Sequence, residues 1–195
     1  MSDRLYLSCW VRGYTESNML RYYGKLLDLF PFSKLTQHTQ TLRVYAVDYA
    51  EPPAAEKPFE PGTITADLLD AAKDFAGPDC AVDLDTAWDL WQYDKDWKVG
   101  PSSVVLTCLG PQFEPDLNDG FQDHLRIDFG LDSRFLPIPG VPDSLKMQQS
   151  NLRSLLHLVQ EIEKKLPLSR RQLWSESGAN FAELLKKSLG EFPVN

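Results

Sequence analysis

Alternation of apolar and polar residues predicts strands in several parts of the chain. Three stretches place apolar side chains at every second position: residues 4–12, 41–49 and 125–131. This is the period of a strand with one buried face. Residues 102–109 are nearly all apolar and rich in β-branched side chains, a pattern typical of a buried central strand. At least one more strand is predicted over residues 80–97, with a turn near Lys95 and Asp96.

Four other stretches space their apolar residues three and four positions apart, the pattern of an amphipathic helix. Ser, Thr and Asn side chains accept hydrogen bonds from the first N–H groups of a helix. The predicted N-caps of the four helices are Ser17, Thr65, Ser150 and Asn180. The helix that follows Ser150 has the most regular apolar stripe, which consists of Leu152, Leu155, Leu156, Val159, Ile162 and Leu166.

The predicted order is strand, helix, strand, helix, three strands and two helices. The fold class is therefore α+β, with a mixed or antiparallel sheet, helices mainly on one face and a ferredoxin-like general layout. Residues 50–62 contain four prolines and are predicted to be a loop, because proline cannot join a strand ladder or a helix interior. We expect one α+β domain over residues 1–195, with a helical segment at 150–190, since about 50 residues alone bury only a small core.

Charge and cysteine content narrow the classes of function. The 195 residues include 20 Lys and Arg and 28 Asp and Glu, a net charge of −8, which disfavours nucleic acids and anionic membranes as partners. No apolar stretch approaches the roughly 20 residues of a membrane-spanning helix, and the first residues do not resemble a signal peptide. The three cysteines include no CxxC pair, so we expect reduced thiols and a cytoplasmic location.

The histidines give no indication of a metal site, and no cofactor is predicted. His38, His124 and His157 are the only three, and none pairs with another at HxH or HxxxH spacing. Zinc and iron sites usually need several His or Cys ligands. His124 begins a predicted strand, and its spacing to Asp128 and Asp132 does not show whether it meets either of them.

The polar face of the predicted sheet has the clearest functional content. When the strands are aligned by their apolar side chains, one face carries Leu5, Leu7, Cys9, Val11, Leu42, Val44, Val82, Leu84, Leu125, Ile127 and Phe129. The helices can cover this face. The opposite face then combines aromatic rings, guanidinium groups and carboxylates, which are common in interfaces and polar-ligand sites. Its predicted ligand- or partner-binding residues are Trp10, Arg12, Arg43, Tyr45, Asp83, Asp85, Arg126 and Asp128.

The polar face, and a group of aromatic residues between positions 88 and 97, also have purely structural interpretations. The polar face equally fits a hydrated sheet surface with cross-strand ion pairs, such as Asp83 with Arg126. The aromatic residues between 88 and 97 fit either a stacking platform for sugars or anchors in the core. Anchors are favoured, because tryptophan buries a large area wherever it packs.

Two classes of function are the main alternatives, and a scaffold subunit that acts only within a complex is a third, less favoured one. The first is a non-enzymatic ligand-binding or assembly protein. Its partner is a second copy of the chain, another protein or an anionic small molecule, and exposed aromatic rings on the polar face favour the homodimer. The second is a small hydrolase or transferase that uses Asp83, Asp85 and Arg126, because two carboxylates on one strand face can serve as acid and base. Convergence of these residues with His124 in a closed pocket favours the enzyme, and dispersal over a flat face favours binding.

Overall fold

A seven-stranded sheet forms the centre of the computed structural model, which describes residues 3–114, 122–177 and 181–190. The strands lie in the order β3-β2-β4-β5-β6-β1-β7, and all neighbouring strands are antiparallel. They are β1 (Arg4–Val11), β2 (Gln40–Ala46), β3 (Ala55–Phe59), β4 (Cys80–Asp94), β5 (Asp96–Leu109), β6 (Leu125–Leu131) and β7 (Leu168–Ser175).

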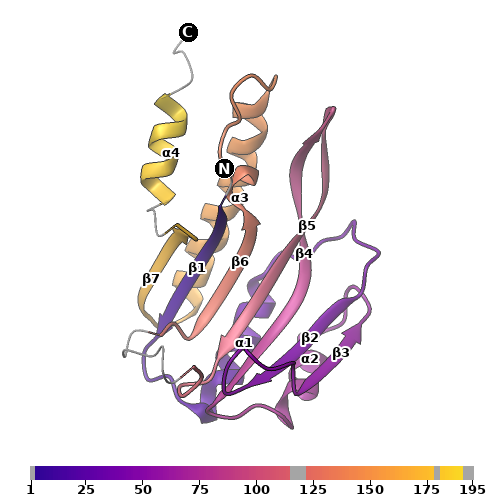
Figure 1. The fold of residues 1–195 in the computed structure, drawn as a ribbon, viewed down its shortest axis with the longest axis vertical. Coiled ribbons are helices and arrows are strands. Elements are labelled where there is room, and N and C mark those ends of the chain that lie inside the picture. Colours follow the sequence, from indigo (N-terminus) through magenta and orange to yellow (C-terminus); the bar gives the residue numbers. More distant parts are fainter. Residues whose placement is uncertain (1–2, 115–121, 178–180, 191–195) are drawn as a thin grey trace.

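Three helices cover one face of this sheet. In Figure 1, α1 (Glu16–Leu29), α2 (Thr65–Lys73) and α3 (Ser144–Lys165) lie behind the strands. A short 3-10 helix (Asp132–Arg134) follows β6, and α4 (Phe181–Gly190) lies beyond the end of β7. The fold class is therefore α+β, as predicted. The ferredoxin-like layout is not confirmed, because that unit has four strands and this sheet has seven.

The core lies between the sheet and the three helices. Every side chain that the sequence assigned to the apolar face is buried in it, so the alternation identified the inward side of each of those strands correctly. Tyr23 of α1 is fully buried, and its hydroxyl donates to the carbonyl oxygen of Leu106 at 2.7 Å. Trp88 is 4% exposed and packs against Phe30 and Phe129, which confirms the anchor interpretation for this residue.

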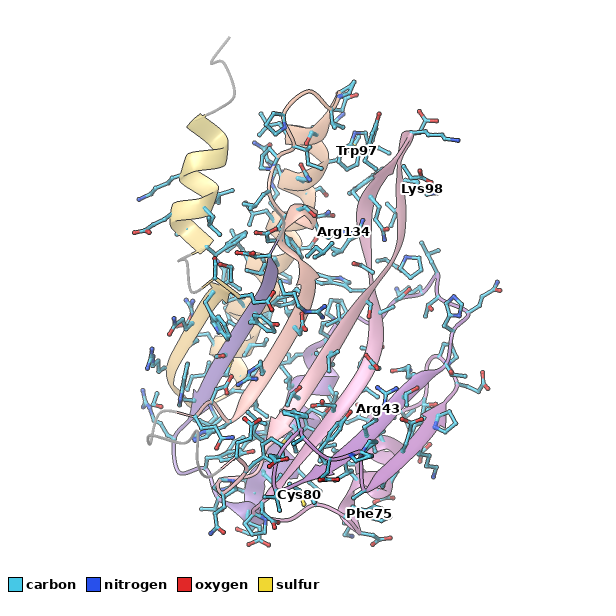
Figure 2. The ribbon with its side chains drawn as sticks, viewed as in Figure 1. Arg43, Phe75, Cys80, Trp97, Lys98 and Arg134 are labelled. Carbon is cyan, nitrogen blue, oxygen red and sulfur yellow. The ribbon has the colours of Figure 1, made fainter. Side chains whose placement is uncertain are left out.

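The strands β4 and β5 form a long hairpin whose outer half extends beyond its neighbours. Only residues 80–85 of β4 pair with β2, and only residues 105–108 of β5 pair with β6. The pairing within the hairpin continues to Asp94 and Asp96. Its turn falls at Lys95, which has a φ of 66°, so the predicted turn is confirmed. Figure 2 shows Trp97 and Lys98 at the far end of this hairpin.

Buried polar side chains hold the first turns of α3. The Asn151 amide accepts a hydrogen bond from the Trp91 N–H at 2.9 Å and donates one to the Trp91 carbonyl at 2.9 Å. Ser144 Oγ accepts from the Ile138 N–H at 2.7 Å, and Gln148 is buried as well. The helix begins at Ser144 and not near Ser150. Its first turns bury polar side chains, so they lack the apolar stripe from which the helix was predicted.

Both edge strands are missing from the sequence prediction. The edge strand β3 lies inside the proline-rich stretch 50–62 and contains Pro58, which an edge position tolerates. The other edge strand, β7, pairs with β1 along its length, and its exposed residues 169–172 are all polar. Neither segment has the one-sided apolar alternation of the inner strands.

Two element boundaries also differ from the prediction. The helix α1 begins after Thr15, whose N–H donates to Asn18 Oδ1 at 2.9 Å, and not after Ser17. The strand β2 ends at Ala46, because Val47 has a φ of 69°, which lies outside the β region of a residue with a Cβ atom.

The three cysteines are free thiols, and all of them are buried. Cys9 and Cys108 belong to the strand faces that form the core, as their alternation indicated. In the part of the chain that the structure describes, no helix combines the length and the apolar character needed to span a membrane.

Candidate functional site

The open face of the sheet carries two rows of side chains that cross all seven strands. Residues that are paired on adjacent strands lie side by side on one face. The first row, from β3 to β7, consists of Glu56, Arg43, Asp83, Thr107, Arg126, Ser8 and Gln172. The second row consists of Pro58, Thr41, Asp85, Val105, Asp128, Tyr6 and Trp174. We call these the polar rows.

The arginines of the first row are neutralised by carboxylates. Arg43 contacts Glu56 at 2.6 Å and also pairs with Asp85, and the hydrogen bond with Asp85 is the main cause of the raised pKa of Arg43. Arg126 makes two hydrogen bonds to Asp123, of 2.8 and 2.6 Å. An anion bound to either guanidinium must compete with a carboxylate already in place.

The predicted cross-strand pair of Asp83 with Arg126 does not form. These residues stand on β4 and β6, and β5 lies between them with Thr107 at the intervening position. Cross-strand pairs require adjacent strands, and the sequence did not show which strands would be adjacent.

Asp123 contacts the first polar row through Arg126, and it was not among the binding residues predicted from the sequence. It is 4% exposed, and it holds Arg126 through both carboxylate oxygens. Its Oδ2 also accepts a hydrogen bond of 2.5 Å from Ser8 Oγ, and the same Ser8 oxygen accepts one of 3.0 Å from Trp174 Nε1. Asp123 precedes β6 in an irregular segment, where no periodicity marks a residue as inward-facing.

A small apolar cluster covers one end of the open face. It consists of Ala81, Leu109 and Phe113, with Tyr45 packed against it. Tyr49 lies edge-on to Tyr45 and to Phe113, at centroid distances of 4.8 and 5.0 Å. Figure 1 shows the chain after β2, which carries Tyr49, crossing in front of the sheet at this end.

Asp83 lies at the border of this cluster. Burial raises the pKa of Asp83 to about 6, although hydrogen bonds from Thr107 and Tyr49 and the charge of Arg126 act in the opposite direction. The Tyr49 hydroxyl is 3.2 Å from Asp83 Oδ1. A carboxyl group with such a pKa changes its protonation state close to neutral pH, as groups in binding and catalytic sites often do.

Asp83→Asn should flatten the pH dependence of stability. The folded-state pKa lies above the ordinary value of 3.8, so protonated Asp83 favours the folded state, and this contribution is lost as the pH rises through about 6. Between about pH 4.5 and about pH 7.5 the difference is about 2 kcal/mol, and the variant should gain that much relative to the wild type at the higher pH. Urea unfolding at both pH values measures it. Asp96→Asn, in the exposed hairpin turn, controls for the lost charge, and parallel pH curves for Asp83→Asn and the wild type would contradict the assignment.

His124 does not join the polar rows. Its Nδ1 accepts a hydrogen bond of 2.9 Å from the Val11 N–H, and its ring stacks on Tyr14 with the centroids 4.1 Å apart. Burial lowers the pKa of His124, in keeping with a nitrogen that must stay unprotonated to accept a hydrogen bond. The segment before β6 brings the ring to β1, and the contacts of the ring are with Val11 and Tyr14.

The aromatic residues of the open face are covered by neighbours in the chain. Trp10 lies under the guanidinium of Arg170, which is 4.4 Å from the ring centroid. Tyr6 stacks on Trp174 at a centroid distance of 4.6 Å. These rings and that of Tyr45 are partly buried, so the face does not present the broad exposed aromatic surface that the sequence suggested.

A hollow of about 440 Å³ opens on this face beside the second polar row. Its lining consists of Thr36, His38, Thr39, Gln40, Thr41, Asp85, Thr86, Ala87, Pro101 and Ser103. The volume lies within the usual range for small-molecule sites. Among the described residues, the hydroxyl groups of Thr39, Thr41 and Ser103 have no hydrogen-bond partner. Asp85 lines the hollow, and the other predicted site residues, Asp83 and Arg126 included, are not part of its lining.

The other predicted site residues are dispersed. Asp128 pairs with Arg4 at 2.9 Å, and Arg12 lies beyond the end of β1, where its N–H donates to the Pro167 carbonyl oxygen at 2.8 Å. Within the described residues, no group of three His, Cys, Asp or Glu side chains is placed to hold a metal ion. Comparison of the chain with protein-family models, with curated proteins and with solved structures found no match.

Proposed function

We propose that the protein is a non-enzymatic binding protein and that a small polar ligand occupies the hollow beside Asp85. The observation that carries this proposal is the dispersal of the charged groups of the open face. Asp85 pairs with Arg43, Arg126 pairs with Asp123, and His124 stacks on Tyr14. Catalysis by acid, base and electrophile needs such groups around one reacting atom, whereas binding needs only a shaped surface with free hydrogen-bonding groups.

The lining of the hollow favours a ligand that is rich in hydrogen-bond donors. Hydroxyl groups can donate or accept, and the Asp85 carboxylate only accepts. Arg43, the nearest cation in the rows, is already held by Asp85 and Glu56. A neutral polyol or a small amine fits this lining better than an anion does, so the anionic small molecule suggested by the sequence is not our proposal for this face.

A screen of small compounds followed by calorimetry tests the hollow. Polyols, monosaccharides and small amines should raise the melting temperature, and carboxylates should not. Thr41→Val removes a free hydroxyl at nearly constant shape, and Ser103→Ala removes another, so each should weaken the binding of the best compound about fivefold to tenfold. Ser154→Ala, on the exposed side of α3, is the matched control and should leave the affinity unchanged.

Two results would overturn this proposal. One is stabilisation by carboxylates alone, and the other is unchanged affinity in both Thr41→Val and Ser103→Ala. Light scattering on the same samples also separates ligand binding from self-assembly through the open face. A mass near that of one 22.2 kDa chain is expected, because the rings that favoured a homodimer are covered within the chain.

One observation favours the alternative of a small hydrolase or transferase that uses an Asp/Arg site. Asp83, with its pKa of about 6, has the protonation behaviour of a general acid or base. Because Asp83 does not line the hollow, each compound of the screen is incubated with the protein and analysed by mass spectrometry, whether or not it binds there. Recovery of the compound unchanged after long incubation supports binding, and a converted product whose formation is lost in Asp83→Asn supports the enzyme.

A further inference from the structure

A second hollow, of about 510 Å³, lies at the corner where β1 ends and α3 passes into β7. Its lining consists of Arg12, Glu163, Leu166, Pro167, Leu168, Ser169, Arg170 and Arg171. It does not share a lining residue with the hollow beside Asp85. The two hollows are therefore separate sites on the molecule.

The charges around this second hollow are unbalanced. Arg171 pairs with Glu163 at 2.9 Å. Arg170 donates to Gln172 Oε1 at 2.6 Å and lies over the Trp10 ring. Among the residues that the structure describes, neither Arg12 nor Arg170 has a carboxylate partner. Three guanidinium groups thus meet one carboxylate, in a protein whose net charge is −8.

Hydrogen bonds join the two segments that carry Arg12 and Arg170. The Arg12 N–H donates to the Pro167 carbonyl at 2.8 Å, and Ser169 Oγ donates to the Trp10 carbonyl at 3.1 Å. Trp10 and Arg170 are paired across β1 and β7, and the Trp10 ring supports the Arg170 guanidinium from below. The two arginines without a carboxylate partner therefore stand on neighbouring segments whose backbones are joined by hydrogen bonds.

We propose that this second hollow binds the phosphate group of a small molecule through Arg12 and Arg170. The planar guanidinium donates two parallel hydrogen bonds to a phosphate, a geometry that lysine cannot reproduce. Arg12, Arg43 and Arg126 are the three arginines among the predicted binding residues. Arg43 and Arg126 are already neutralised, whereas Arg12 has no carboxylate partner among the described residues and retains this capacity. Charged residues on an edge strand also prevent strand pairing between molecules, but that role requires neither a hollow nor Arg12, which lies outside β7.

Titration with inorganic phosphate at constant ionic strength tests the proposal. The Trp10 indole and the Ser169 amide should show saturable chemical-shift changes in ¹H–¹⁵N spectra. Arg12→Gln and Arg170→Gln should each weaken phosphate binding about tenfold, the loss expected for a charge-assisted hydrogen bond. Lys98→Gln removes the same charge at the far end of the hairpin (Figure 2) and should leave the affinity unchanged. The melting temperature of each variant shows whether it is folded.

Additional variants and a second anion test whether the binding depends on the guanidinium group and on the phosphate. Arg12→Lys keeps the charge without the planar fork, so it should recover only part of the lost affinity. Acetate at the same ionic strength should bind more weakly than phosphate, and Thr41→Val should leave phosphate binding unchanged. Two results would overturn the proposal. One is chemical-shift changes that stay linear with phosphate concentration, and the other is an equal loss of phosphate affinity in Arg12→Gln and Lys98→Gln. Both would show that phosphate responds only to the overall charge of the protein.

Discussion

Asp123→Ala should destabilise the protein by about 3–5 kcal/mol, the cost of breaking a buried ion pair by removing one partner. Asp123 is 4% exposed, and it binds two guanidinium N–H groups of Arg126 and the hydroxyl of Ser8. Without it, Arg126, whose side chain is only 31% exposed, has no carboxylate to compensate its lost hydration. We therefore expect the first polar row to lose its order together with the stability.

Urea unfolding measures this loss, and Glu56→Ala is the matched control. Glu56 also pairs with an arginine of the first polar row, but its side chain is 53% exposed, and Arg43 keeps its second partner Asp85. An exposed pair of this kind contributes about 0–1 kcal/mol. Similar losses in Asp123→Ala and Glu56→Ala would contradict the structural role that we assign to Asp123.

Leu155→Ala should destabilise the protein by about 2–5 kcal/mol, through lost burial and the cavity that remains. Leu155 has no exposed surface and packs in the core between α3 and the sheet. Its neighbour Leu156 is 45% exposed, although the sequence assigned both residues to the apolar stripe. Leu156→Ala should therefore change stability by no more than about 0.5 kcal/mol. Equal denaturation midpoints for the two variants would show that the buried side of α3 has been assigned wrongly.

Periodicity predicted the inner part of this fold well and its edges poorly. The strands β1 and β6 have one face in the core, so that burial produces the alternation by which they were recognised. The edge strand β7 is exposed over residues 169–172, and β3 contains a proline, so neither is required to alternate. The first turns of α3 are held by Ser144, Gln148 and Asn151, and a pattern of buried polar residues resembles that of a loop.

For the candidate site, the sequence predicted which side chains share the open face but not their partners. Alternate residues of a strand point to opposite faces of the sheet. The alternation therefore placed Arg43, Asp83 and Asp85 correctly on the open face. Partners depend on strand order and on irregular segments. The order places Thr107 between Asp83 and Arg126, and the segment before β6 supplies Asp123. Neither fact has a local signature in the sequence.

The contact between Asn151 and Trp91 has a consequence for the order in which the chain folds. The side-chain amide of Asn151 satisfies the N–H and the carbonyl of Trp91 as a neighbouring strand would, and the two residues are 60 positions apart. A loop of that length must close before either hydrogen bond can form, which costs entropy that local contacts do not repay. The local turn at Lys95 can bring the two strands of the hairpin together early, whereas the attachment of its outer half to the start of α3 must wait until that loop has closed.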